Sequence, residues 1–66
     1  MIKYIKIGDK IVDSESMRMG TIVDLVEELD ADGNMTYQSA KIDFSNGDID
    51  WISGDRVTKL LLETGE

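Results

Sequence analysis

The 66-residue chain contains no cysteine, no histidine and no proline. Without cysteine it can form neither a disulfide framework nor a thiolate zinc site, and without histidine it lacks the usual metal ligand and the usual general base near neutral pH. The longest apolar runs, such as Leu60-Leu61-Leu62, are too short to span a membrane, and the first residues lack a signal-peptide core. We therefore expect a soluble, cytoplasmic protein that is not an enzyme and holds no cofactor or metal.

The length of the chain allows one small domain. A chain of this size buries roughly 60% of its unfolded surface, which is enough for a marginally stable core but leaves no room for a deep active-site cavity. We expect the domain to span residues 1–62, followed by a frayed tail at 63–66.

The net charge of −7 is unevenly distributed along the chain. Residues 24–50 carry eight acidic residues against Lys41 alone, and this difference equals the whole net charge. The first twelve residues have the opposite balance, with three lysines against one aspartate. A field of this sign repels phosphate backbones and favours basic partners, although it also serves solubility.

Apolar and polar residues alternate with a period of two along most of the chain, which is typical of strands. A first strand with Ile5, Ile7 and Ile11 is predicted to bend at residues 8–9. Further strands are predicted at residues 20–26, 36–44, 49–52 and 57–62. The expected fold class is therefore all-β.

The second predicted strand leaves an alternative open. Alternation puts Thr21, Val23 and Leu25 on one face, but apolar residues also stand at positions 22, 25, 26 and 29 with helical spacing. A helix over residues 23–29 therefore remains a lesser alternative.

Three groups of turn-forming residues separate the later strands. Residues 30–34 form a polar turn, and Asn-Gly within residues 45–48 is the strongest short-range hairpin signal because both residues tolerate positive φ. Residues 53–56 are expected to form a short helical or 3₁₀ turn. We expect Ala40, Ile42 and Phe44 to point inward, with Ile49 and Trp51 on the inward face of the next strand.

Two stretches resemble known small-barrel patterns. IGDKIVDSESMRMGTIVDL, from Ile7 to Leu25, resembles the KOW motif, in which a Gly-Asp turn, a short strand, a variable loop and a Gly-led apolar strand follow one another. FSNGDIDWISGDRVTKL looks like the closing strands of Tudor-like barrels. The resemblance implies a single five-stranded SH3-like barrel. The matched KOW positions are Gly8, Asp9, Ile11, Gly20, Val23 and Leu25.

The KOW resemblance implies a role in transcription or translation, through contact with RNA or a polymerase. In the variable loop, however, residues 13–16 read Asp-Ser-Glu-Ser where the family commonly has glycine and basic residues, and Arg18 is the only cation. Nucleic-acid binding needs a positive stripe with exposed aromatic residues near it. Direct binding to nucleic acid is therefore disfavoured, and a protein-contacting role is favoured.

Tudor-like barrels can hold a methylated lysine in a cage of aromatic side chains through cation–π attraction. This chain has Tyr4, Tyr37, Phe44 and Trp51. Because Phe44 and Trp51 are expected in the core, the two tyrosines are too few to form a cage.

Residues 30–41 resemble the start of an EF-hand loop, with oxygen ligands at the first, third and fifth positions. Met35 stands where the loop needs glycine, and Lys41 stands where it needs a bidentate glutamate. We interpret this segment as a polar hairpin loop, with weak surface binding of calcium as a residual possibility.

The carboxylates Asp43, Asp48 and Asp50 are expected on one exposed sheet face. With no cleft and no histidine beside them, they suit a contact patch better than acid–base catalysis.

We therefore expect a small acidic protein-interaction module, a regulator or inhibitor that binds a basic surface of a transcription or other nucleic-acid-handling enzyme. Its size fits a phage or bacterial regulator. Charge would set the rate and orientation of binding, and apolar anchors, Met35 among them, would supply affinity. The predicted binding residues are Asp24, Glu27, Tyr37, Asp43, Asp48, Asp50 and Ile52.

Two alternatives remain. The chain could mimic DNA by presenting carboxylates at phosphate-like spacing to a DNA-binding groove. It could instead be a KOW-type nucleic-acid-binding module that uses Lys3, Lys6, Lys10 and Arg18.

Overall fold

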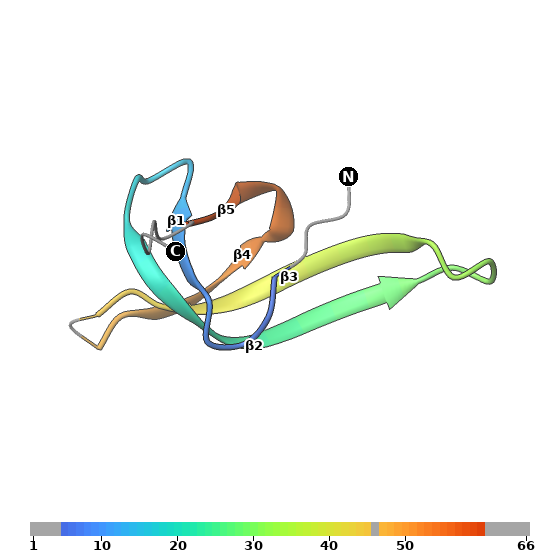
Figure 1. Cartoon of the computed structure of the whole chain (residues 1–66), viewed down its shortest axis with the longest axis horizontal. Helices are drawn as coiled ribbons and strands as arrows, with labels where there is room; N and C mark the ends of the chain where they lie inside the picture. Colours follow the sequence, from blue (N-terminus) through green and yellow to red (C-terminus); the bar gives the residue numbers. More distant parts are fainter. Residues whose placement is uncertain (1–4, 46, 61–66) are drawn as a thin grey trace, which may run out of the picture.

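The computed structural model describes residues 5–45 and 47–60. The described residues form one sheet of five antiparallel strands (Figure 1), and none of them is in an α-helix. The all-β prediction is confirmed. The elements are β1 (Lys10–Asp13), β2 (Met19–Leu29), β3 (Met35–Asp43), β4 (Ile49–Ser53), the 3₁₀ turn η1 (Gly54–Arg56) and β5 (Val57–Lys59).

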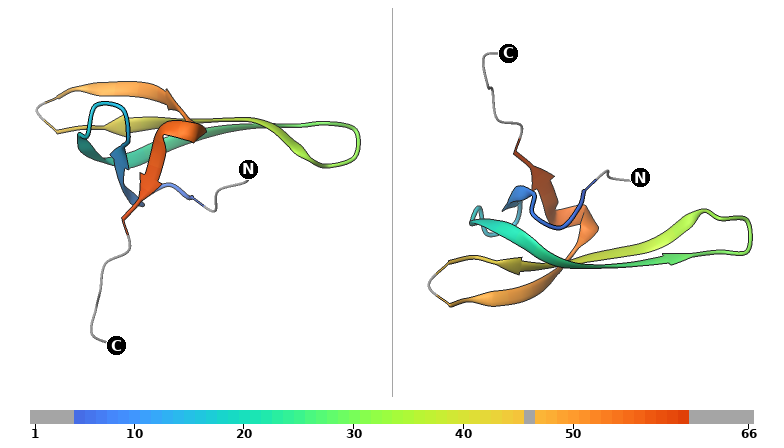
Figure 2. Two further views of the ribbon diagram at one scale, coloured as in Figure 1. Left: turned by 90° about the horizontal axis from the view of Figure 1, so that it is seen from above. Right: turned by 60° about the horizontal axis from the view of Figure 1, so that its bottom comes forward.

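The first four strands pair with their neighbours in the sequence, and β5 returns to pair with β1, so the spatial order is β4-β3-β2-β1-β5. The long strand β2 pairs with β1 near its start and with β3 along most of its length. Figure 2 shows β1 and β5 together on one side of the layer formed by β2, β3 and β4. The two end strands, β4 and β5, do not pair with each other in the described part of the chain.

The hydrophobic core is small and is built from aliphatic side chains of all five strands. Phe44, which follows β3, is the one aromatic residue among its buried members and is 7% exposed. Ile5 and Leu25 pack against this core and are partly buried. The inward positions predicted for Ala40, Ile42 and Phe44 are confirmed. The buried members are Ile11, Ile22, Ala40, Ile42, Phe44, Ile52 and Val57.

Strand β2 contains a β-bulge that explains its helix-like spacing. Ile22 pairs with Ile42, but the next pair is Asp24 with Lys41, so Val23 is an extra residue on β2. An extra residue reverses the alternation beyond it, and Ile22 and Leu25 therefore both face the core. The predicted face of Thr21, Val23 and Leu25 is wrong for this reason, and the segment is a strand rather than a helix.

Strand β4 faces the opposite way to the prediction. Residues directly opposite each other in an antiparallel pair share a face, and Ile52 pairs with the fully buried Ala40. Ile52 is consequently 4% exposed, whereas Trp51 and Ile49 are 42% and 51% exposed. The placement of Trp51 in the core is wrong, because the inward residue of this strand is its neighbour.

The predicted turns before and after β4 agree with the structure. The short turn predicted after β4 is present and is of the 3₁₀ type. The hydroxyl oxygen of Ser53 caps it by accepting a hydrogen bond from the backbone N–H of Asp55 at 3.2 Å. A hairpin joins β3 to β4, with the N–H of Asp48 donating to the carbonyl of Ser45 at 3.0 Å. The conformation of Asn46 lies outside the described residues.

The outer ends of the chain differ from the predicted strands. The first strand begins at Lys10, and Ile5 and Ile7 precede it outside the sheet. The last strand ends at Lys59. Residues 61–62 and the predicted tail at 63–66 lie outside the described residues.

Gly20 allows β2 to pack closely against the end of β3. A Cβ atom at this position would lie 2.4 Å from Cγ2 of Ile42 and 2.8 Å from the carbonyl oxygen of Asp43. Only a residue without a side chain fits there. Among residues 5–45 and 47–60, no helix is long and apolar enough to cross a membrane.

Candidate interaction surface

The face of β2, β3 and β4 that points away from the core is open to solvent. Its central row is set by strand register: Asp24 on β2 lies opposite Lys41 on β3, which lies opposite Trp51 on β4. We call this the outer face. Its other members are Thr21, Val26, Glu28, Tyr37, Asp43, Ile49 and Ser53, together with Ser39, which is buried between its neighbours.

Four apolar or aromatic side chains on the outer face are about half exposed. They come from all three strands of the layer. Exposed aromatic and aliphatic side chains gathered on one face are characteristic of binding surfaces. The exposed fractions are 41% for Val26, 49% for Tyr37, 51% for Ile49 and 42% for Trp51.

Acidic residues surround these apolar side chains. Asp24, Glu28 and Asp43 lie on the outer face against the single cation Lys41. A carboxylate oxygen of Asp24 accepts a hydrogen bond from the N–H of Leu25 at 2.8 Å, and one of Asp43 accepts from the N–H of Ser45 at 3.0 Å. These backbone contacts fix the orientation of both carboxylates on the surface.

The structure brings together only three of the seven predicted binding residues, namely Asp24, Tyr37 and Asp43. Glu27 lies on the opposite face, where its carboxylate accepts a hydrogen bond from the side-chain amide of Gln38 at 3.3 Å. Ile52 is buried in the core, so its side chain is not accessible to a partner.

The two remaining predicted residues, Asp48 and Asp50, are also not on the outer face. Asp50 shares the inner face with Ile42, its partner on β3, and reaches solvent at the end of the core. Its charge helps to raise the pKa of Arg56, after the larger effects of Asp13 and Glu15. Asp48 lies in the β3–β4 turn and forms an ion pair with Arg18.

Sequence reasoning missed four outer-face residues: Val26, Glu28, Ile49 and Trp51. The prediction that Ile49 and Trp51 face the core is wrong, because alternation groups them on one face of β4 without showing which face is buried. The pairing of Ile52 with Ala40 is the information that was missing.

The acids on the inner side of the fold are satisfied by structural contacts. Asp13, 2% exposed, accepts hydrogen bonds from Nε of Arg56 at 3.0 Å, from the N–H of Glu15 at 3.0 Å and from the hydroxyl of Ser16 at 2.9 Å. The Arg56 hydrogen bond, aided by those from Glu15 and Ser16, holds the pKa of Asp13 far below its usual range against the opposing effect of burial. Asp13 therefore ties the β1–β2 loop to η1.

The cations that would contact nucleic acid are engaged within the chain. Nζ of Lys6 lies 3.1 Å from the carboxylate of Asp9, and Nζ of Lys10 donates a hydrogen bond to the hydroxyl of Thr21 at 2.9 Å. The guanidinium of Arg18 pairs with Asp48 and also lies 4.2 Å from the centroid of the Phe44 ring. Lys3 lies outside the described residues.

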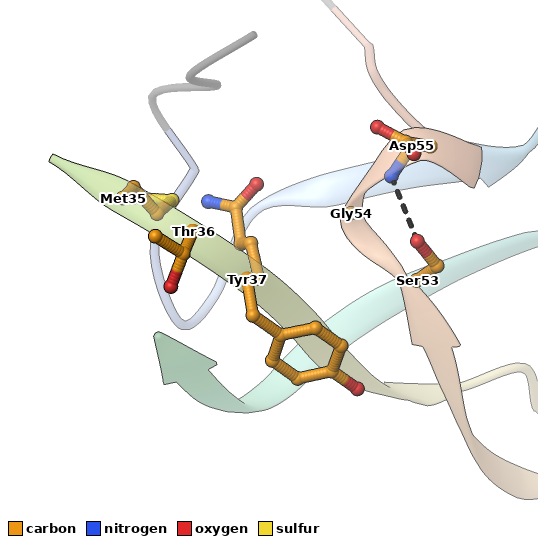
Figure 3. A pocket seen from close by; sticks show the side chains of 7 residues that line it. Met35, Thr36, Tyr37, Ser53, Gly54 and Asp55 are labelled. Carbon is orange, nitrogen blue, oxygen red and sulfur yellow. Dashed lines mark hydrogen bonds between the residues drawn. The ribbon is translucent and has the colours of Figure 1, made fainter. Parts of the chain in front are cut away.

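A small groove lies between the start of β3 and η1. Its volume is about 240 Å³. In Figure 3, Met35, Thr36 and Tyr37 of β3 stand on one side of it, and Ser53, Gly54 and Asp55 stand on the other. Tyr37 and Ser53 belong both to this groove and to the outer face, so the two are continuous.

The EF-hand-like segment forms a hairpin turn held by its first residue. A carboxylate oxygen of Asp30 accepts hydrogen bonds from the N–H groups of Asp32 and Asn34, both at 2.9 Å. These contacts lower the pKa of Asp30, that from Asn34 most. In the part of the chain that the structure describes, no three acidic residues are grouped closely enough to hold a metal ion.

Comparison of the chain with protein-family models, with curated proteins and with solved structures found no match.

Proposed function

We propose that this protein is a small acidic interaction module whose outer face binds a basic surface of a nucleic-acid-handling protein. One observation carries the proposal: Trp51, the only tryptophan of the chain, lies on the end strand β4 and is 42% exposed on a sheet face that also exposes Tyr37 and Ile49. Burying this tryptophan in the core, where Phe44 is the one aromatic residue among the buried members, would stabilise the protein. Its exposure on the outer face instead suits contact with a partner.

The apolar residues and the charges would play different parts in binding. Trp51, Tyr37 and Ile49 would be covered by the partner and supply affinity, since aromatic anchors dominate the energy of most interfaces. Asp24, Glu28 and Asp43, within the field of a chain of net charge −7, would attract and orient Lys and Arg side chains. This division predicts a basic partner with an apolar patch at its centre.

We also propose that the fold is an SH3-like barrel of the KOW or Tudor type. The strand order, the 3₁₀ turn between the last two strands, and the long β2 shared by both halves of the sheet support this assignment. Fold alone leaves the function open, so the interaction proposal rests on the outer face.

The two alternatives receive less support from the side-chain arrangement. Of the cations in the nucleic-acid-binding alternative, Lys6 and Arg18 are neutralised by Asp9 and Asp48. A DNA mimic needs its acids along one surface, whereas Asp43 and Asp50 lie on opposite faces of the sheet.

The test is capture of proteins from nuclease-treated lysate by the immobilised chain and its variants. Trp51→Ala removes the central anchor. The triple variant Asp24→Asn, Glu28→Gln, Asp43→Asn removes the charge of the outer face while keeping side-chain shape. Ile7→Ala is the control, because Ile7 is 60% exposed and precedes β1 outside the sheet.

We expect a basic protein to be retained by the wild-type chain and by the Ile7 control and to be lost with the other two variants. The triple variant should also elute at lower salt. Equal retention by all four proteins would contradict the proposal, as would recovery of nucleic acid in place of a protein when the nuclease is omitted.

A further inference from the structure

The two end strands of the sheet expose edges of different character. β5 is three residues long and carries Lys59, whose ammonium lies 3.5 Å from Asp9. Short, charged edges discourage pairing with another chain. β4 is five residues long, pairs with β3 alone among residues 5–45 and 47–60, and carries the exposed Ile49 and Trp51. β4 is therefore the edge at which a further strand could add.

The backbone register shows which groups of β4 face this edge. The N–H of Phe44 donates to the carbonyl of Asp48 at 2.8 Å, which makes these residues a hydrogen-bonded pair. Such pairs alternate along an antiparallel ladder, so Asp50 and Ile52 direct their backbone groups to β3. The backbone N–H and C=O groups of Ile49, Trp51 and Ser53 therefore point away from the sheet.

One of these outward donors is covered by the chain itself. A carboxylate oxygen of Asp50 accepts a hydrogen bond from the N–H of Trp51 at 2.9 Å. A strand that pairs with β4 must replace this contact with its own carbonyl. The carboxylate of Asp50 thus occupies the hydrogen-bond donor at the middle of the edge. A nearby positive charge would favour breaking this hydrogen bond, because the carboxylate could pair with that charge instead.

We infer that β4 accepts an additional strand from an extended basic segment of the partner, an inference that rests on the proposed function. A Lys or Arg side chain of the added strand draws the carboxylate of Asp50 away, and a backbone carbonyl of that strand takes the Trp51 N–H. Apolar side chains on the opposite face of the added strand, which continues the outer face, pack against Trp51 and Ile49. Main-chain hydrogen bonds supply affinity, and alternate side chains supply specificity.

The charge of the edge argues for a basic partner rather than a second copy of this chain. Two β4 strands paired about Trp51 would place Asp50 of each chain diagonally across from Asp50 of the other, within reach of repulsion. Each chain also carries a net charge of −7. A strand with Lys or Arg at alternate positions meets neither penalty.

Ser53 offers a pair of substitutions that differ mainly in the edge backbone. Its φ of −64° is the value that proline requires, and its N–H faces away from β3. Ser53→Pro therefore removes an outward donor without breaking the β3–β4 ladder. Ser53→Ala is the matched control, since both variants lose the hydroxyl cap of η1 and only the proline loses the N–H.

The probe is an acetylated and amidated eight-residue peptide of alternating lysine and valine, titrated against each variant with Trp51 fluorescence as the readout. We expect Ser53→Pro to weaken binding about tenfold relative to Ser53→Ala, because a backbone hydrogen bond is lost and the proline ring obstructs the edge. Asp50→Asn should weaken binding of this peptide but not of its threonine–valine analogue. Circular dichroism confirms that each variant is folded.

The outcomes distinguish strand addition at the edge of β4 from binding by the outer face. Equal binding by the Pro and Ala variants, or no binding of the peptide to the wild-type chain, overturns strand addition. If the captured partner is lost with Trp51→Ala but retained by Ser53→Pro, strand addition is wrong and the proposed function stands. If that partner is retained by both variants and by the outer-face triple variant, both proposals fail.

Discussion

The inner and outer faces of β4 are made by adjacent residues with opposite environments. Ile52 is 4% exposed and packs in the core, whereas Trp51, one residue earlier, is 42% exposed and lies beside Lys41 on the outer face. The acids divide in the same way, because Asp13 is buried under four hydrogen bonds while Asp24 bonds a single neighbouring backbone N–H. Residue type alone therefore does not show whether a side chain stabilises the fold or is available to bind a partner.

The largest contrast between the faces should come from truncating the two neighbours on β4. We expect Ile52→Ala to lower the free energy of unfolding by about 3 kcal/mol, since it leaves a cavity in a small core. Trp51→Ala should cost about 1 kcal/mol or less, because much of the ring is already hydrated. Urea unfolding of both variants measures the difference, and a larger loss for Trp51→Ala would contradict the facing of β4.

Removing the charge of a buried and of an exposed aspartate should give the next largest contrast. Asp13→Asn should lower the free energy of unfolding by about 2 kcal/mol, because the guanidinium of Arg56 loses its charged acceptor. Asp24→Asn should change it by no more than about 0.5 kcal/mol. Thermal unfolding at neutral pH compares the two variants. Similar losses of stability at the two sites would contradict the distinction between a structural Asp13 and a surface Asp24.

Asp13 also sets a pH dependence with a defined sign. Its pKa is lowered in the folded state from a usual value of 3.8. Its stabilising contribution is therefore fully present above about pH 4 and is lost as the pH falls further. We expect the wild-type chain to lose stability below about pH 4 more steeply than Asp13→Asn does, and parallel curves in acid-unfolding experiments would contradict this.

Overpacking where β2 approaches β3 should have an effect of similar or slightly smaller size. A Cβ at Gly20 would come within 2.8 Å of the backbone carbonyl of Asp43, which cannot move freely. We expect Gly20→Ala to cost about 2 kcal/mol. Gly33→Ala is a less crowded comparison, since nothing lies within 4 Å of its added Cβ and its cost should come from the φ of +84° alone.

The smallest predicted effect is a gain in stability in the β3–β4 turn. Ser45 has a φ of 80°, which a residue with a side chain adopts only at a cost. Ser45→Gly should relieve this strain and raise the free energy of unfolding by about 0.5 kcal/mol, with no change in binding by the outer face. A decrease in the melting temperature would contradict the expectation.

Local patterns predicted the parts of the fold that depend on nearby residues. Ala40 and Ile42 on β3 alternate without interruption with Phe44 just after it, and Ser53 with Asp55 provides the cap of a short turn. These features need no knowledge of which strand lies opposite.

Prediction from the sequence was wrong where the buried face of a strand is decided by the strand that pairs with it. Alternation separates residues into two sets but does not tell which set is buried, so Trp51 was assigned inward over Ile52. The bulge at Val23 is an extra residue only relative to β3, and it reverses the facing of every later residue of β2. Asp50 is wrongly predicted to share the face of Asp43 because the facing of β4 is set by its pairing with β3. Glu27, three residues after Asp24, lies on the face opposite to Asp24 by alternation alone.

The fluorescence of Trp51 tests the central claim most directly, because it is the only tryptophan in the chain. In the free protein we expect emission typical of a partly hydrated indole and ready quenching by acrylamide. Addition of the captured basic partner should shift the emission to shorter wavelength and protect the indole from the quencher. A tryptophan already shielded in the free protein, or one whose emission and quenching do not change when the partner binds, would contradict the assignment of the outer face as the binding surface.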